Sequence, residues 1–203
     1  MWQWLSQLEG AQSGLVGSFA GFVFGITALI LGALFNFRLN RRRDALLQAE
    51  EADAVAAALF GEIILIRKEL ARTANLVARR EMANGSFDKH FLELIRLQDP
   101  LLYKALANKL GLLDPAIILA ITHFHANVEI VRAWLPHLVK TEERDFSYSP
   151  LTVLEPAIEA VEGIKPTIDA LAVKMGVESP TDGLDIGAAH AVTASERESF
   201  TNK

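Results

Sequence analysis

The sequence contains no cysteine among its 203 residues. This absence excludes disulfide bonds, thiolate zinc ligands and cysteine nucleophiles, and it agrees with a reducing compartment. The motifs GxSxG, GxxxxGKS/T and GxGxxG are also missing, so the sequence shows neither a nucleophile elbow nor a glycine-rich phosphate-binding loop. The carboxylate pairs Glu50-Glu51 and Glu142-Glu143 lie in polar stretches typical of solvated surfaces. We therefore expect no catalytic residue, no cofactor and no enzymatic activity.

Charged side chains are absent from residues 14–37, a run of 24 positions without Asp, Glu, Lys, Arg or His. At about 1.5 Å per residue, such a helix reaches about 36 Å and crosses a hydrocarbon core of about 30 Å. Ser18 and Thr27 do not make a polar face, unlike the pattern of a soluble core helix. Residues 1–13 lack Lys and Arg, which excludes the basic start of a signal peptide. We predict a transmembrane helix at 14–37 after a short extracytoplasmic segment.

Positive charge follows this run on one side only. The residues that we name the basic collar are Arg38, Arg41, Arg42 and Arg43. Lys and Arg accumulate on the cytoplasmic side of membrane helices, and each contributes about 1 kcal/mol near an anionic leaflet. We therefore predict that the N-terminus lies outside, that the basic collar faces lipid headgroups, and that residues 38–203 are cytoplasmic. Trp2 and Trp4 suit the outer headgroup layer.

Small residues recur along one face of the predicted transmembrane helix. Their spacing alternates between four and three, and we name them the small-residue seam: Gly14, Ser18, Gly21, Gly25, Ala28 and Gly32. Lipid gives no hydrophobic drive between helices, so close backbone approach over small residues is a main source of association. The seam predicts a homo-oligomer with a coiled-coil-like repeat, or docking against a partner membrane helix. The alternative is that glycine is simply common in membrane helices.

The remainder of the chain has helical periodicity and no strand pattern. A long helix is predicted over 44–83, where Asn84-Gly85 should stop it. The sequence leaves open whether this helix continues the membrane helix, because neither Gly nor Pro separates the two. The stretch 86–98 is compatible with a short helix or with an extended segment.

Helix start signals recur further along. Asp99-Pro100 and Asp114-Pro115 each place a capping Asp before a Pro at the first helical position. Thr152 with Glu155 forms a capping-box pattern. The helix after Asp114-Pro115 has the most regular apolar face: Ile117, Ile121, Phe124, Val128, Val131, Leu135 and Leu138.

These patterns together predict an all-α protein. The single N-terminal transmembrane helix is followed by a long helix and an antiparallel cytoplasmic helical bundle, which together occupy residues 38–176. Residues 177–203 lose the periodicity and end in polar residues, so we predict a disordered tail there.

The stretch from Asp99 to Arg132 resembles a module of uncharacterised bacterial membrane proteins that join one N-terminal transmembrane helix to a cytoplasmic helical domain. The resemblance is carried by a DPxxYxxxxxxxGLLxP-like pattern: Asp99, Pro100, Tyr103, Gly111, Leu112, Leu113 and Pro115, with an aromatic residue near Phe124. It implies a bacterial inner (plasma) membrane and brings no known activity.

Histidines are the candidate metal ligands of the sequence. His123 and His125 lie two positions apart, hence about 200° apart around a helix, and cannot share one metal ion. His125 and Glu129 have the i, i+4 spacing of a ligand pair, but two ligands are too few for a site. We therefore expect no metal site. An alternative hypothesis places a small-ligand pocket between bundle helices at Tyr103, His123, His125 and Trp134.

Charge and pattern narrow the function to three hypotheses. The net charge of −5 and the lack of a basic stripe beyond the collar exclude nucleic acid as an expected partner. The favoured function is a self-associating, membrane-tethered interaction or scaffold module whose partners are the lipid bilayer and another copy or membrane helix. The alternative is a membrane-anchored sensor that binds a small ligand in the bundle. A holin-like pore is disfavoured because one span without a polar stripe would line a water channel poorly.

Overall fold

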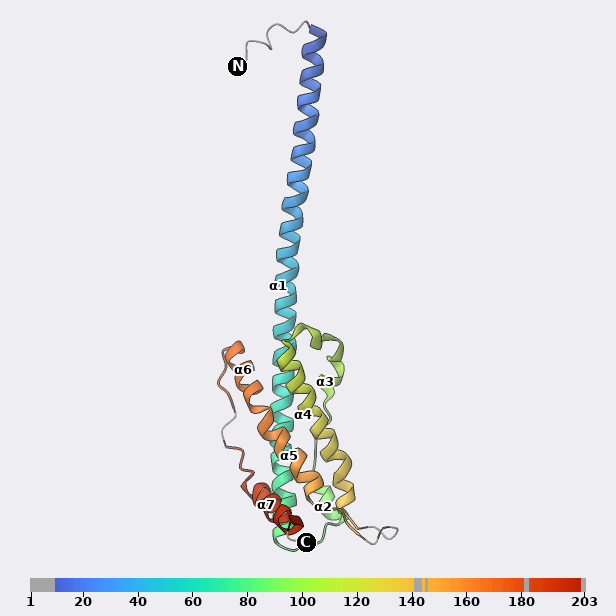
Figure 1. Ribbon diagram of the computed structural model, residues 1–203, viewed down its shortest axis with the longest axis vertical. Helices are drawn as coiled ribbons and strands as arrows, with labels where there is room; N and C mark the ends of the chain where they lie inside the picture. Colours follow the sequence, from blue (N-terminus) through green and yellow to red (C-terminus); the bar gives the residue numbers. More distant parts are fainter. Residues whose placement is uncertain (1–9, 141–143, 145, 181–182, 202–203) are drawn as a thin grey trace. The chain divides into compact units, whose positions relative to one another are not determined.

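The computed structural model describes residues 10–140, 144, 146–180 and 183–201, with the backbone alone for 10–16, 200 and 201. The described residues form helices and no β-strand, which confirms the all-α class (Figure 1). In chain order the elements are α1 (Gly10–Met82), α2 (Lys89–Glu93), α3 (Leu101–Ala105), η2 (Ala107–Leu112), α4 (Pro115–Trp134), η3 (Leu135–Leu138), α5 (Leu151–Gly163), α6 (Lys165–Met175) and α7 (Gly187–Thr201). The chain divides into two compact units, Met1–Glu50 and Glu51–Lys203.

Helix α1 is uninterrupted over its 73 residues. The helical backbone continues through Asn36 and Asn40, so no break separates the apolar segment from the helix that follows. In the first unit every described side chain, from Gly17 to Glu50, is exposed. Its largest apolar side chains include Phe24, 76% exposed, and Leu29, 74% exposed. The apolar surface of this segment is therefore left uncovered by the part of the chain that the structure describes.

Among the described residues, two helical segments are long and apolar enough to cross a membrane, Gly17–Met82 and Pro115–Leu138. The most apolar stretch of the first is not buried at all, whereas a third of the second is. The second segment consists of α4 and η3, and one face of it contributes Ile121, Phe124 and Val128 to the core. A core helix of a soluble protein can be as long and as apolar as a membrane helix, so we assign the second segment to the core.

The second unit has one hydrophobic core. The part of α1 from Val55 to Ala78 supplies one face, and this confirms the periodicity of the predicted long helix. Helices α4, α5, α6 and α7 supply most of the other buried residues, including Phe124, Leu154, Ile168 and Val192. Several polar residues are buried as well; among them is Arg67, whose Nε donates a hydrogen bond to the carbonyl of Val161 at 2.7 Å, so its guanidinium has a partner.

The helix directions differ from the antiparallel bundle that we predicted. Lys109 of η2 lies 2.7 Å from Glu51, and Lys174 in the last turn of α6 lies 2.8 Å from Asp53. Both η2 and the C-terminal end of α6 therefore lie beside the residues of α1 that begin this unit. Helix α4 starts after η2 and runs in the same direction as α1, whereas α5 and α6 run back (Figure 1). The parallel pair arises because residues 83–114, which include α2, α3 and η2, carry the chain back along the unit before α4 begins.

One predicted helix stop and one predicted helix start are formed by the residues that we expected. Asn84 ends α1 with a left-handed φ of 50°, and the amide of Gly85 donates to the carbonyl of Arg80 at 2.9 Å, as in a Schellman cap. Asp114 caps α4, because its carboxylate accepts the amide of Ala116 at 2.9 Å. Both of these predictions are confirmed.

Two predicted caps are wrong. Pro100, not Asp99, occupies the position before α3, and Asp99 lies 3.3 Å from Arg132 instead. Thr152 lies inside the first turn of α5, where its hydroxyl donates to the carbonyl of Ser149 at 2.8 Å. Asp99 and Thr152 each contact a partner other than the amides at the start of the helix, and the spacing of the sequence does not show which partner a side chain takes.

The prediction of a disordered tail over 177–203 is wrong for its larger part. Residues Gly187–Thr201 form α7, and Ile186, Ala189 and Val192 are buried in the core. The side-chain amide of Asn75 on α1 donates to the carbonyl of Asp185 at the start of this segment. Packing against the core, rather than a regular apolar stripe, stabilises this helix.

Candidate functional site

The apolar segment of α1 presents a surface without neighbours. A Cβ added at Gly17, Gly21, Gly25 or Gly32 would meet no atom within 4 Å. Gly14, the first seam residue, lies in the helical backbone of α1, but its surroundings fall outside the described residues. The hydroxyl of Thr27 donates to the carbonyl of Val23 at 2.7 Å, so it satisfies itself within its own helix. The segment therefore combines open glycine positions with an apolar, uncharged surface.

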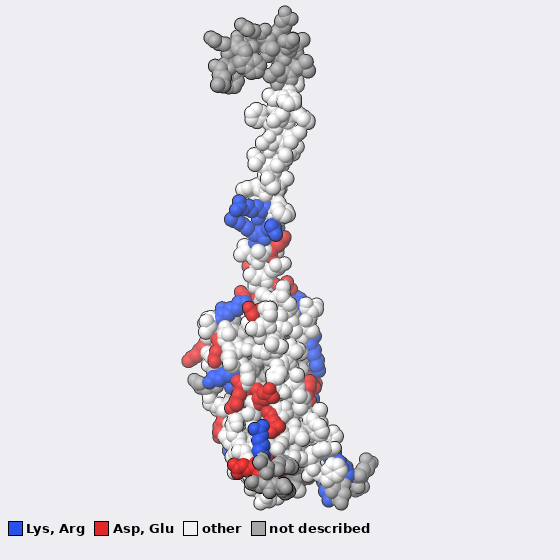
Figure 2. Space-filling view, in the orientation of Figure 1, with Lys and Arg blue, Asp and Glu red and all other residues white. Residues whose placement is uncertain are grey.

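The basic collar follows directly on the same helix. Figure 2 shows a stretch of α1 without charged side chains that ends at a cluster of Lys and Arg. All four arginines are exposed, and the guanidinium of Arg41 lies 5.4 Å from the ring centroid of Phe37, one turn earlier. Charge thus begins where the apolar run ends, as the sequence predicts.

The four residues of the predicted pocket do not come together. Tyr103 and His125 stack with ring centroids 4.0 Å apart. His123 is exposed and lies 3.5 Å from Glu159 of α5. Trp134 packs edge-to-face against His137 and Tyr148. Among the contacts of these four residues, the structure joins only Tyr103 to His125, and the hollows described below are lined by other residues.

His125 is more deeply buried than the half-buried side chain that its position beside Phe124 suggests. It is 3% exposed, and neither of its ring nitrogens has a hydrogen-bond partner among the described atoms. Burial lowers the pKa of His125 to about 4, so its imidazole is neutral at neutral pH. A neutral imidazole without partners packs as an aromatic side chain. Among the described residues no three His, Asp or Glu side chains gather to hold a metal ion.

Glu62 connects α1 to α3 and was missed by the sequence reasoning. Its side chain is buried, with 8% of the residue exposed, and its two carboxylate oxygens accept the amides of Leu102 and Tyr103 at 2.7 and 2.8 Å. These amides have no acceptor within α3, because they belong to its first turn. A carboxylate from another helix therefore does the capping that was expected of Asp99, and it holds the backbone of Tyr103, whose ring stacks on His125.

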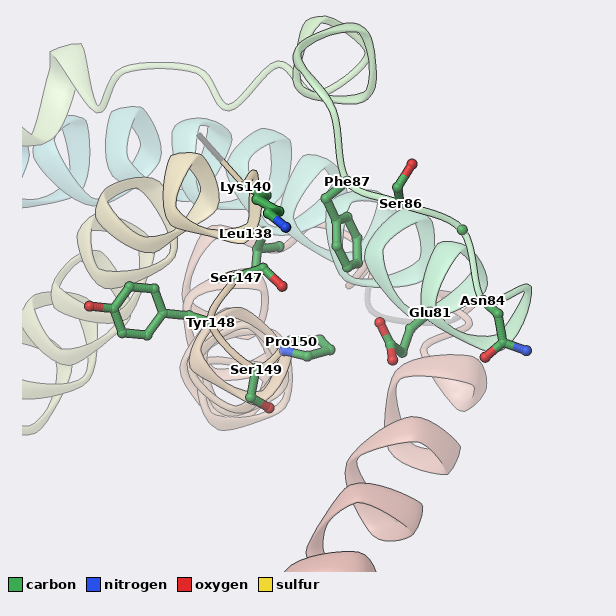
Figure 3. A pocket seen from close by; sticks show the side chains of 11 residues that line it. Glu81, Asn84, Ser86, Phe87, Leu138, Lys140, Ser147, Tyr148, Ser149 and Pro150 are labelled. Atoms are coloured by element: carbon green, nitrogen blue, oxygen red, sulfur yellow. The ribbon is translucent and has the colours of Figure 1, made fainter. Parts of the chain in front are cut away.

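A hollow of about 700 Å³ lies at the end of α1 (Figure 3). Its lining comes from the α1 terminus and the segment after it, including Glu81 and Phe87, and from Leu138, Lys140 and residues 147–150. In Figure 3, Lys140, Ser147 and Pro150 point into the hollow from one side, and Glu81 and Phe87 from the other. The ring of Tyr148 points away from it. No motif in the sequence indicated this hollow; only Asn84-Gly85 at its rim was singled out, as a helix stop.

Among the residues that line this hollow, Glu81 has a shifted pKa. Its pKa is raised, first by burial and second by the negative charge of Glu196 on α7. Glu81 and Glu196 also face a smaller hollow of about 340 Å³ between α1 and α7. In the described part of the chain, neither carboxylate has an ion-pair partner.

Comparison of the chain with protein-family models, with curated proteins and with solved structures finds no match. The resemblance of Asp99–Arg132 to uncharacterised membrane proteins therefore stays a prediction.

Proposed function

We propose that this protein is a single-pass membrane protein in which α1 anchors a helical interaction or scaffold module to the lipid bilayer. The observation that carries the proposal is the exposed, uncharged surface of α1 over residues 17–37. Burying apolar side chains in lipid contributes about −0.3 to −0.6 kcal/mol for each Leu, Ile, Phe or Val near the bilayer centre. In water this surface would be an aggregation hazard, so a bilayer is the environment that suits it.

The orientation follows from the basic collar. With the arginines at an anionic leaflet, the N-terminus lies outside and the helical unit from Glu51 lies in the cytoplasm. A bacterial inner membrane is the compartment that the resemblance implies. The cation–π contact of Arg41 with Phe37 supports a place at the headgroup boundary, where a ring and a cation both find suitable surroundings.

Self-association through the small-residue seam completes the proposal. The open space around Gly21 and Gly25 admits a second helix at close backbone distance. Thr27 has its hydroxyl satisfied within α1, which agrees with packing against a helix or lipid and disfavours a water-filled pore. The module itself needs no catalytic group; its role is to place the helical unit at the membrane in an oligomer.

Two measurements on the full-length chain test the anchor and its orientation. After alkaline carbonate extraction, the protein should remain in the membrane pellet. Single cysteines introduced at Ser6 and Ser86 should react with an impermeant thiol reagent from opposite sides of sealed membranes, because the native chain has no cysteine to interfere. Release by carbonate would overturn the anchor, and equal labelling of both positions in sealed membranes would overturn the orientation.

A further inference from the structure

The hollow at the end of α1 has groups of opposite charge on opposite walls. Glu81 projects into it from the last turn of α1, and Lys140 projects into it from the segment after η3 (Figure 3). The ring of Pro150 lies on the same side as Lys140, and the ring of Phe87 lies on the same side as Glu81. The ring of Phe87 is held edge-to-face by Phe91, with centroids 5.2 Å apart, so this apolar wall is supported from behind.

Glu81 occupies a position that is unfavourable for a carboxylate. It lies in the last turn of α1, where the unpaired carbonyls of the helix end repel negative charge. Burial and Glu196 both raise the pKa of Glu81, and no described residue supplies a cation to it. Residues that break local rules in this way occur preferentially at functional sites. A bound ammonium group would relieve the repulsion.

The opposite wall is suited to an anion. The ammonium of Lys140 carries three N–H donors, so a contact within the chain leaves others for a ligand. The hydroxyl of Ser147 lies on the same side of the hollow and adds a donor (Figure 3). The volume, about 700 Å³, lies within the range of about 300–1,000 Å³ usual for small-molecule sites.

We propose that this hollow binds a small zwitterion, an α-amino acid with an apolar side chain. Its ammonium group pairs with Glu81, its carboxylate contacts Lys140 and Ser147, and its side chain lies against Phe87 and Pro150. The site differs from the pocket that the sequence suggested around Tyr103 and His125. It does not rest on the membrane proposal, because all of its groups belong to the unit Glu51–Lys203.

Binding of L-leucine to the full-length protein in detergent tests the proposal, with ligand-observed NMR as the readout. Two analogues each lack one charged group: 3-methylbutylamine has no carboxylate, and 4-methylpentanoate has no ammonium. We expect leucine to bind about tenfold more tightly than either analogue, because each charge-assisted contact contributes on that scale. Glu81→Gln should weaken leucine binding about tenfold and remove the preference for leucine over 4-methylpentanoate. Glu178→Gln, an exposed carboxylate outside the hollow, is the matched control and should change nothing.

A thermal melt tests whether the Glu81→Gln variant is folded. Because Glu81 is repelled by the helix end and by Glu196, Glu81→Gln should melt at the same temperature as the native protein or higher. The proposal is overturned if the native protein shows no binding at about 10 mM leucine, which corresponds to less than about 3 kcal/mol. It is also overturned if Glu81→Gln binds leucine as tightly as the native protein, or if 3-methylbutylamine binds as tightly as leucine.

Discussion

At the scale of single residues, His125 makes stability depend on pH. Burial lowers the pKa of His125 to about 4, from 6.5 in the unfolded chain. Between these values the unfolded chain binds a proton that the folded chain excludes. Stability is therefore complete above about pH 6.5 and falls as the pH drops toward 4, by up to about 3 kcal/mol. Urea unfolding of the full-length protein in detergent, followed across this range, measures the loss.

Replacing His125 separates its contribution to the pH dependence of stability from that of other groups. His125→Phe should keep an aromatic ring against Tyr103 and should lose the part of the pH dependence that the imidazole causes. His90→Gln is the control, because the His90 side chain is 83% exposed and should leave the slope unchanged. An equal pH slope in His125→Phe and in the native protein would show that other groups cause it.

Glu62 permits a second prediction at this scale. Glu62→Gln replaces one of two accepting oxygens with an amide group that cannot accept the N–H of Leu102 or Tyr103. We expect a loss of about 2 kcal/mol in the free energy of unfolding. Glu69→Gln removes only a pair with Arg72 at 3.7 Å and should cost less than about 0.5 kcal/mol. Equal losses in both variants would contradict the capping role.

The sequence predicted residues whose roles are set by near neighbours in the chain and missed those set by distant ones. Asn84 and Asp114 act on amides or carbonyls within five residues, so their spacing was sufficient. Glu62 acts on an amide 40 positions away, and nothing local distinguishes it from other acidic residues of a helix surface. The burial of His125 likewise depends on Tyr103, which is on another element.

At the scale of elements, α7 is the clearest difference between expectation and structure. Val192 is 5% exposed, whereas Ala194 on the same helix is exposed. Val192→Asp places an unpaired charge in the core and should cost about 3 kcal/mol or more, detaching α7. Ala194→Asp should cost less than about 1 kcal/mol, mostly through helix propensity. Proteolysis near residues 177–186 and urea unfolding measure both effects, and equal behaviour of the two variants would place α7 outside the core.

The helices that were predicted correctly have long apolar stripes. The stripes on α1 from Val55 to Val77 and on α4 and η3 from Ile121 to Leu138 are dense enough to identify a core face unaided. In the described part of α7 the buried residues are Ala189, Val192 and Thr193, and His, Ser, Glu and Arg are among the residues at the other positions. The sequence of α7 therefore looks like that of a polar tail, because this helix depends on tertiary packing rather than on an apolar stripe. The direction of α4 was missed for a related reason: residues 83–114 contain only short helices, so the sequence gives no sign that they return along the unit.

At the scale of the whole molecule, the proposal of an oligomer depends on what fills the open space along α1. A second α1 helix packed on the small-residue seam would bring backbones close at Gly21 and Gly25, where the described residues leave that space empty. Leu side chains at these positions would separate the two backbones and remove the close contacts. The double variant Gly21→Leu, Gly25→Leu should therefore lower the crosslinked oligomer fraction of the full-length protein in membranes by about tenfold, equivalent to about 1.4 kcal/mol.

The control variant also adds leucine side chains to the apolar segment of α1, but on a different face of the helix. Ala20→Leu with Ala33→Leu adds comparable bulk at positions that lie about 100° or more around the helix from the centre of Gly21 and Gly25. This pair should leave both the oligomer fraction and carbonate resistance unchanged. Both double variants keep the uncharged run, so both should stay in the membrane, and this separates loss of association from loss of anchoring. If the glycine variant crosslinks as well as the native protein, glycine is present in α1 only because it is common in membrane helices, and any association of the protein uses another surface.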